Sequence, residues 1–210
     1  MKINKKSKLF IAGHNGLVGK AILKEAKNMG FTNIITIEKK KLDLMDQKRV
    51  FSYLKKIKPH GVIIAAAKVG GIMANSKYKA NFIYDNLSIQ NNLIHGSYLS
   101  GVKNLIFLGS SCIYPKITKL PIKESALLTG SLENTNEPYA IAKIAGLMMC
   151  RDYSKNFKLN FKALMPTNLY GPGDNYDANN SHFYPALLKK IYLAKIKKKK
   201  NNYFMGLWFS

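Results

Sequence analysis

Short apolar runs alternate with longer segments of helical spacing along most of the chain. Parallel strands covered on both faces appear in sequence as such continuous apolar runs. They occur at residues 8–12, 33–37, 61–66, 104–108 and 161–165. Helices are expected from the glycine-rich turn to about residue 29, and at 48–56, 78–100, 138–153 and 183–195. Because strands alternate with helices, the pattern predicts an α/β fold with a doubly wound parallel sheet.

The length and composition suit one well-buried domain. The chain has 210 residues, of which 47% are hydrophobic, an ordinary share for a globular protein. No apolar run approaches the ~20 residues that cross a bilayer, and residues 1–7 lack the apolar centre and cleavage site of a signal peptide. The sequence therefore predicts a cytoplasmic protein without a membrane partner.

The net charge of +23 raises the question of a nucleic-acid partner. Only Arg49 and Arg151 are arginines, whereas nucleic-acid readers rely on arginine forks and exposed aromatic rings. Scattered lysine is typical of an A-rich coding sequence, so we expect no nucleic-acid partner, although a positive cleft favours a nucleotide-diphosphate substrate. The two cysteines, Cys112 and Cys150, form no disulfide framework and show no metal-ligand spacing, so no metal site is predicted.

Three glycines stand between the first strand and the first helix. Glycine permits a tight turn there and lets the backbone approach a pyrophosphate held at the helix N-terminus. This context predicts a Rossmann-type dinucleotide site. The residues concerned are Gly13, His14, Asn15, Gly16, Leu17, Val18 and Gly19.

The end of the second strand is expected to contact the adenosine ribose. Glu38 falls 19 residues after Gly19, and a carboxylate at this place binds the 2′-hydroxyl of NAD. Lys39, Lys40 and Lys41 follow directly, and a cation there instead holds the 2′-phosphate of NADP. A solvated lysine run is the plainer interpretation. The residues leave NAD and NADP both open.

Tyr139 and Lys143 lie four residues apart in a helix that Pro138 is suited to begin, and therefore on one face of it. A tyrosine hydroxyl, with a pKa of about 10, is a poor acid–base group at neutral pH. We expect the lysine charge one turn away to lower that pKa. Taken alone, this spacing is more often a solvated helix face. Together with the glycine turn it predicts a nicotinamide-dependent enzyme that acts on carbonyl or alcohol groups.

The strand at 104–108 leads into Ser110, Ser111 and Cys112, at the edge where open α/β sheets bind ligands. The Ser110 hydroxyl can hydrogen-bond the substrate oxygen that Tyr139 protonates, and Cys112 can act as a base where its thiolate is favoured. The plainer interpretations are a turn residue for Ser110, a small buried hydrophobe for Cys112, and a surface position for His182.

From Phe10 to about Lys195 the chain resembles GDP-L-fucose synthases, which belong to the extended short-chain dehydrogenase/reductase superfamily. The glycine turn and residues 136–146 resemble the whole superfamily. Two segments, Lys68-Val-Gly-Gly-Ile72 and Gly109-Ser-Ser-Cys-Ile-Tyr-Pro115, together with Asn180-Ser-His182, are more specific to the synthases. Residues 165–172, Met-Pro-Thr-Asn-Leu-Tyr-Gly-Pro, match as well.

The resemblance implies a two-part reaction on GDP-4-dehydro-6-deoxy-D-mannose, a GDP-sugar. C3 and C5 are epimerised, with Cys112 as base and His182 as acid. NADPH then reduces C4, with Tyr139 as proton donor, Lys143 tuning it and holding the nicotinamide ribose, and Ser110 holding the C4 oxygen. Further cofactor contacts are implied at Lys39, Leu108, Gly109, Ser110, Ser111, Lys143, Pro166, Thr167, Asn168, Leu169 and His182.

The resemblance also implies a substrate contact at Lys190 and a homodimer formed through the helices at 78–100 and 138–153. It divides the chain into a Rossmann domain at 1–171, a partial substrate-binding segment at 172–196 and a basic tail at 197–210. Only the start of a small C-terminal substrate domain is then expected. The resemblance implies NADP(H). Asn15 departs from it, because many members carry an arginine there for the 2′-phosphate, and Lys39 can take that arginine's place. NADP(H) is therefore favoured while NAD(H) stays open.

The tail has an explanation in the genetic code. Met205-Gly206 must be encoded ATG-GG, so a frame read one base later gives Trp, and Trp208-Phe209 gives Gly in the same way. A Trp-Gly motif occurs in the resembled family at this place. We therefore hypothesise a frameshift in the A-rich tract that encodes residues 197–200, which the nucleotide sequence tests.

Three alternatives stay open from the sequence. The first is another nucleotide-sugar epimerase, reductase or dehydratase, of which Ser111-Cys112 disfavours the dehydratase. The second is an inactive fragment that binds a dinucleotide without turnover. The third is a basic nucleic-acid binder, which a steep salt dependence of affinity would reveal.

Overall fold

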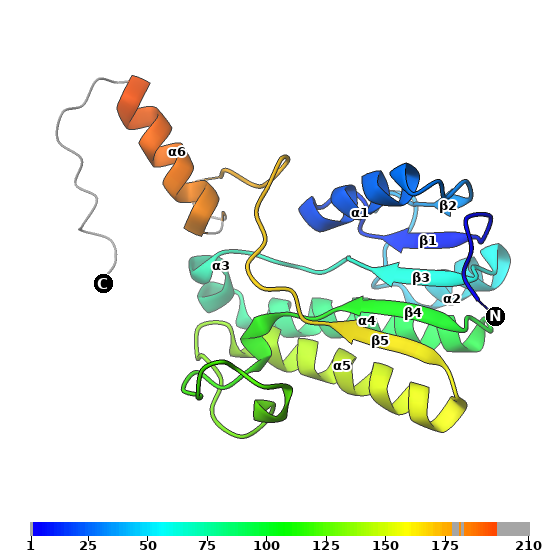
Figure 1. Ribbon diagram of the computed structural model, residues 1–210. Helices are drawn as coiled ribbons and strands as arrows, with labels where there is room; N and C mark the ends of the chain where they lie inside the picture. Colours follow the sequence, from blue (N-terminus) through cyan, green and yellow to red (C-terminus); the bar gives the residue numbers. More distant parts are fainter. Residues whose placement is uncertain (1, 178–180, 182, 197–210) are drawn as a thin grey trace.

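Five parallel strands form one sheet among the residues that the structure describes. The structure is a computed structural model, which describes residues 2–177, 181 and 183–196. The strands lie in the order β2-β1-β3-β4-β5 (Figure 1). Their bounds are β1 Leu9–Ala12, β2 Ile34–Ile35, β3 Gly61–Ile64, β4 Asn104–Leu108 and β5 Asn160–Leu164. Each strand lies within or next to a predicted apolar run, and β2 is much shorter than its run.

Helices separate the strands in sequence and cover both faces of the sheet. Their bounds are α1 Leu17–Asn28, α2 Gln47–Ile57, α3 Ile72–Lys77, α4 Lys79–Leu99, α5 Glu137–Phe157 and α6 Phe183–Ile196. Short 3₁₀ turns follow β4 at η1 Ser111–Ile113 and precede α5 at η2 Glu124–Ala126. Helix α3 and both 3₁₀ turns have no counterpart in the sequence prediction, because elements this short leave little periodicity.

The register of the strands explains why two cores form. Phe10 pairs with Val62, Val62 with Leu105, and Leu105 with Phe161, so one row of side chains crosses four strands on one face. This face packs against α2, α4 and α5 in the larger core. Leu9 and Ile11 alternate to the other face, where they pack against α1 around Ala26. The doubly wound parallel α/β fold is thereby confirmed.

Helix α6 stands away from the sheet in Figure 1, and it contacts the segment that precedes it. The Lys189 Nζ donates to the carbonyl of Tyr176 at 2.8 Å, and the rings of Tyr170 and Tyr184 lie 4.4 Å apart. Pro185 is the buried residue of the helix. Within the described part of the chain, no helix is long and apolar enough to cross a bilayer.

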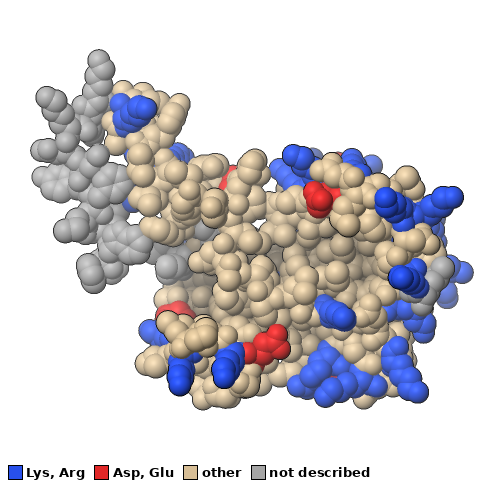
Figure 2. Space-filling model, viewed as in Figure 1, with Lys and Arg blue, Asp and Glu red and all other residues tan. Residues whose placement is uncertain are grey.

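The basic side chains are unevenly distributed over the face drawn in Figure 2. Most visible Lys and Arg side chains lie over the right half, where the strands begin, and few acidic side chains interrupt them. The middle of this face is mostly uncharged.

Candidate active site

The predicted site residues gather at one edge of the sheet because all five strands run in the same direction. The glycine turn follows β1, residues 65–71 follow β3, Ser110 to Cys112 follow β4, and Pro166 follows β5 (Figure 1). Strand pairing places β1 and β4 on either side of β3. Segments more than 140 residues apart in sequence therefore share one edge.

The glycine turn has the geometry that the sequence predicts. Gly13 has a φ of +88°, and a side chain there would also collide with the backbone of Ala66. A Cβ on Gly19 would collide with the carbonyl of Gly13, so this glycine lets α1 lie directly on the turn. The Gly16 amide donates to the Gly13 carbonyl at 3.1 Å, and Gly16 begins the helix as its N-cap.

These features fit a dinucleotide. The first turn of α1 contains no acidic residue, so the amide groups and the positive end of the helix dipole are suited to a pyrophosphate. The Nδ1 of His14 is buried in this turn without a hydrogen-bond partner in the described structure. Asn15 is exposed beside it.

Helix α5 lies unusually close to β4, and this closeness places the reactive side chains. A Cβ on Gly146 would collide with the ring of Phe107, so glycine permits the contact. The buried Gln90 of α4 donates through Nε2 to the Ala142 carbonyl of α5 at 2.6 Å. One turn before Gly146, the buried Lys143 therefore reaches the end of β4, where its Nζ donates to the Leu108 carbonyl at 2.7 Å.

Four predicted catalytic residues meet at this place. Lys143 Nζ lies 5.6 Å from the ring centre of Tyr139 and 4.7 Å from that of Phe107. The Ser110 hydroxyl hydrogen-bonds the side chains of both Tyr139 and Cys112. Ser110 is also the N-cap of η1. Its hydroxyl oxygen accepts a hydrogen bond from the Cys112 amide at 3.5 Å, and this bond directs the turn toward α5.

The pKa of Tyr139 is shifted opposite to the sequence expectation. Burial raises this pKa well above its usual range, a negative charge on Cys112 raises it further, and the Ser110 hydrogen bond lowers it. The expectation was wrong because it treated Tyr139 and Lys143 as surface groups. In the folded chain burial dominates the pKa of Tyr139, and the Lys143 ammonium donates to the Leu108 carbonyl. The phenol consequently holds its proton at neutral pH.

Burial also governs the other two titrating groups. It lowers the pKa of Lys143 to about 8, an effect that a Cys112 thiolate partly offsets. It raises the pKa of Cys112, while the Ser110 hydrogen bond and the Lys143 charge lower it. Cys112 and Lys143 therefore favour each other's charged forms.

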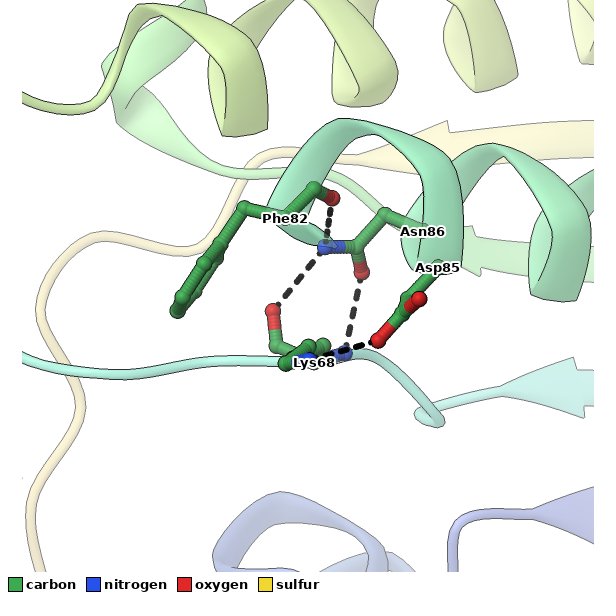
Figure 3. Close-up of polar contacts among 4 residues, drawn as sticks. All are labelled: Lys68, Phe82, Asp85 and Asn86. Atoms are coloured by element: carbon green, nitrogen blue, oxygen red, sulfur yellow. Dashed lines mark hydrogen bonds and ion pairs between the residues drawn. The ribbon is translucent and has the colours of Figure 1, made fainter. Parts of the chain in front are cut away.

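A polar clamp holds the loop after β3 (Figure 3). The Lys68 amide donates to Asn86 Oδ1 at 3.0 Å, and Asn86 Nδ2 donates to the Lys68 carbonyl at 3.0 Å and to that of Phe82 at 2.8 Å. The Lys68 ammonium pairs with Asp85 at 2.6 Å. Because Ala66 of the same loop packs on Gly13, the clamp supports the wall of the glycine turn.

Sequence reasoning missed this clamp, although a signal was present. Phe82, Asn86 and Gln90 are spaced four residues apart and all are buried on one face of α4. An amide at a buried helix position needs a hydrogen-bond partner. Here Asn86 binds the β3 loop and Gln90 binds α5, so the two amides fix the walls on either side of β4.

The remaining predicted residues are less closely gathered. Leu108 is half-buried and Gly109 buried, whereas Ser111, Lys39 and the run Thr167, Asn168 and Leu169 are exposed. Pro166 is half-buried at the end of β5, and Lys190 is exposed on α6. His182 and the tail at 197–210 lie outside the described residues. No cluster of three His, Cys, Asp or Glu side chains suited to a metal ion occurs among the described residues.

Comparison with known proteins gives consistent matches. Residues 9–204 match the model of the NAD dependent epimerase/dehydratase family. A GDP-L-fucose synthase of Sinorhizobium fredii is 54% identical over 190 residues, which are 90% of this chain and 60% of that protein. The chain thus spans about 60% of the length of this curated relative.

Two solved structures share the fold with substantial sequence identity. A GDP-D-glycero-L-gluco-heptose synthase from Campylobacter jejuni, determined in the presence of NADPH, is 42% identical with a TM-score of 0.89. The match covers 93% of this chain and 57% of that one. A GDP-L-fucose synthetase from Naegleria fowleri bound to NADP is 31% identical with a TM-score of 0.84, over 94% of this chain and 61% of that one.

Proposed function

The chain belongs to the NAD dependent epimerase/dehydratase family, and we propose that it performs the chemistry of a GDP-L-fucose synthase. The substrate is GDP-4-dehydro-6-deoxy-D-mannose, which is epimerised at C3 and C5 and reduced at C4. The observation that supports this proposal best is the convergence of Tyr139, Ser110 and Cys112 beside the buried Lys143. Because the chain spans about 60% of its relative's length, the activity of the whole protein is part of the proposal.

The reduction uses the cluster at the end of β4. When bound, the dinucleotide supplies the hydride for C4. Ser110 holds the C4 oxygen, and Tyr139, whose phenol is protonated at neutral pH, gives that oxygen a proton as negative charge develops on it. Lys143, fixed on the Leu108 carbonyl, stabilises the negative charge that develops as the proton leaves.

The epimerisation uses the same oxygen-binding groups. C3 and C5 both adjoin the C4 ketone, so removal of either proton gives an enolate whose charge rests on the C4 oxygen. Cys112 is the base. Burial raises the pKa of its thiol, and the Ser110 hydrogen bond and the Lys143 charge offset part of that rise. His182 is the acid that returns a proton on the opposite face. One set of donors thereby serves both steps.

NADP(H) is the proposed cofactor. The two GDP-sugar enzymes of similar fold were solved with NADPH or NADP. The chain's own cations at the ribose end of the site are Lys39, Lys40 and Lys41, with Glu38 before them. The lysines favour a 2′-phosphate over the bare 2′-hydroxyl.

A homodimer through α4 and α5 is also proposed. These are the two longest helices described, and they pack against each other. Tyr84 on α4 is 65% exposed and Ile141 on α5 is 42% exposed, and large apolar side chains on adjacent helices favour a second copy. Light scattering of the purified chain tests this assignment.

The activity is tested with purified protein, GDP-4-dehydro-6-deoxymannose and NADPH, then NADH, by following the absorbance of the reduced nicotinamide. Epimerisation is followed separately, as deuterium taken up from heavy water at C3 and C5 by NMR. We expect NADPH oxidation that Tyr139→Phe abolishes, and deuterium uptake that this variant lowers only in part, because Ser110 still binds the C4 oxygen. Cys112→Ser is expected mainly to suppress deuterium uptake, because it removes the base of the epimerisation.

The two readouts separate the proposed function from its alternatives. Cofactor binding without oxidation or deuterium uptake would identify an inactive dinucleotide-binding fragment. Oxidation of NADPH with another GDP-sugar, and none with this substrate, would support a related reductase such as the heptose enzyme. Unchanged oxidation in Tyr139→Phe would refute the assigned proton donor.

A further inference from the structure

We propose that Arg49 is a positioning residue for NADP(H) selectivity, which it exerts by fixing the backbone of the Lys39–Lys41 turn, whose ammonium groups would hold a 2′-phosphate. The inference rests on the proposed cofactor. The first turn of α2 would thereby contribute to the choice between NADP(H) and NAD(H). It would do so by holding the Lys39–Lys41 backbone in place, which neither the glycine turn nor the lysine side chains do.

The lysine turn is closed by hydrogen bonds at both of its ends. The amides of Lys41 and Leu42 donate to the Glu38 carbonyl at 3.0 and 3.1 Å. Leu42 is 3% exposed and belongs to the larger core, so its side chain anchors the C-terminal end of the turn. Arg49 Nη2 then donates to the Lys41 carbonyl at 2.6 Å. The guanidinium therefore ties the last lysine to α2.

Arg49 is itself held on a rigid support. Its own amide donates to Asp46 Oδ1 at 3.1 Å, which caps α2. Val50, the next residue, is fully buried in the larger core. Arg49 and Lys41 both line an open hollow of about 380 Å³ between α2 and residues 37–42. The bond between them thus joins the turn to an element that the core already fixes.

The chain needs such a device because the glycine turn brings no cation of its own. Asn15 is uncharged and exposed there, so the lysine turn is the source of positive charge that the sequence predicts for a 2′-phosphate. Lysine side chains are long and flexible, and the negative charge of the neighbouring Glu38 repels a phosphate. Fixing their backbone in advance reduces the ordering cost of binding a phosphate. A bare 2′-hydroxyl gains little from this ordering.

The test measures binding by calorimetry and requires no turnover. NADPH and NADH, and the half-ligands 2′,5′-ADP and 5′-AMP, are titrated into the wild-type chain, Arg49→Ala, Arg49→Lys and Lys48→Ala. We expect Arg49→Ala to weaken NADPH and 2′,5′-ADP about tenfold, or ~1.4 kcal/mol, and to leave NADH and 5′-AMP within twofold. Arg49→Lys should recover part of the loss, because an ammonium can also donate to the Lys41 carbonyl.

Lys48→Ala is the matched control for charge. Lys48 lines the same hollow and carries the same charge, whereas Arg49 makes the bond to the turn. Equal losses in Lys48→Ala and Arg49→Ala would show a general field effect and overturn the inference. Equal losses of NADPH and NADH in Arg49→Ala, or no loss of either, would overturn it too. A wild-type chain that binds NADH but not NADPH would instead refute the proposed cofactor.

Discussion

Lys143 offers a quantitative test of the buried site, because its charge is held in the protein at a measurable cost. The side chain is 3% exposed, and its ammonium donates to the Leu108 carbonyl beside the Phe107 ring. Burial lowers its pKa from 10.5 to about 8. We predict that Lys143→Met, which keeps the length of the side chain and removes its titration, changes how stability depends on pH.

The size and sign follow from the two pKa values. A shift from 10.5 to about 8 disfavours the charged form by roughly 3 kcal/mol. Below about pH 8 both folded and unfolded wild-type chains are protonated, so this cost is present in full. Between pH 8 and 10.5 only the unfolded chain keeps the proton, and wild-type stability rises with pH. Near pH 9.5 about 2 kcal/mol of the cost has been removed.

Urea unfolding of the wild type and Lys143→Met, near pH 7 and near pH 9.5, measures this difference. The free energy of unfolding of the wild type minus that of the variant should increase by about 2 kcal/mol between the two conditions. The other lysines titrate in both proteins, so their contributions cancel. The comparison is made in a Cys112→Ser background, because the pKa of that thiol depends on Lys143. A difference that stays constant with pH would show that Lys143 is solvated, and the account of the site as a desolvated cluster would be refuted.

Two further substitutions test the walls of the site. In Gly19→Ala the new methyl group collides with the Gly13 carbonyl in the turn beneath α1, so NADPH binding should fall more than tenfold in a fluorescence titration. In Gly16→Ala the Cβ lies 3.5 Å from the nearest carbonyl, so NADPH binding should be retained. Equal losses of binding in the two variants would contradict the packing role of Gly19. Asn86→Leu leaves buried backbone groups of the β3 loop unpaired and should lower the free energy of unfolding by ~1–3 kcal/mol. Asp85→Asn removes a half-exposed ion pair and should lower the free energy of unfolding by ~1 kcal/mol or less. If urea unfolding showed a larger loss for Asp85→Asn than for Asn86→Leu, the loop would be held by charge rather than by the amide hydrogen bonds.

The strongest predictions from sequence were those that depend on neighbours along the chain. Apolar runs located the strands, because a parallel strand buried on both faces needs a continuous run. The glycine spacing predicted the turn at Gly13, where only a residue without a side chain fits beside Ala66. The spacing of Tyr139 and Lys143 predicted one helix face. In each case the required physical property is local, so the residue types alone express it.

The amino-acid sequence by itself determined the order of strands and helices, the glycine turn, and the chemical groups available to the site. The tertiary structure decided what those groups experience. Lys143 meets the Leu108 carbonyl 35 residues away, and Gln90 meets Ala142 52 residues away, so neither contact appears in any local pattern. The pKa of Tyr139 depends on burial under these contacts, and so its direction could be obtained only once the helices were packed on the sheet.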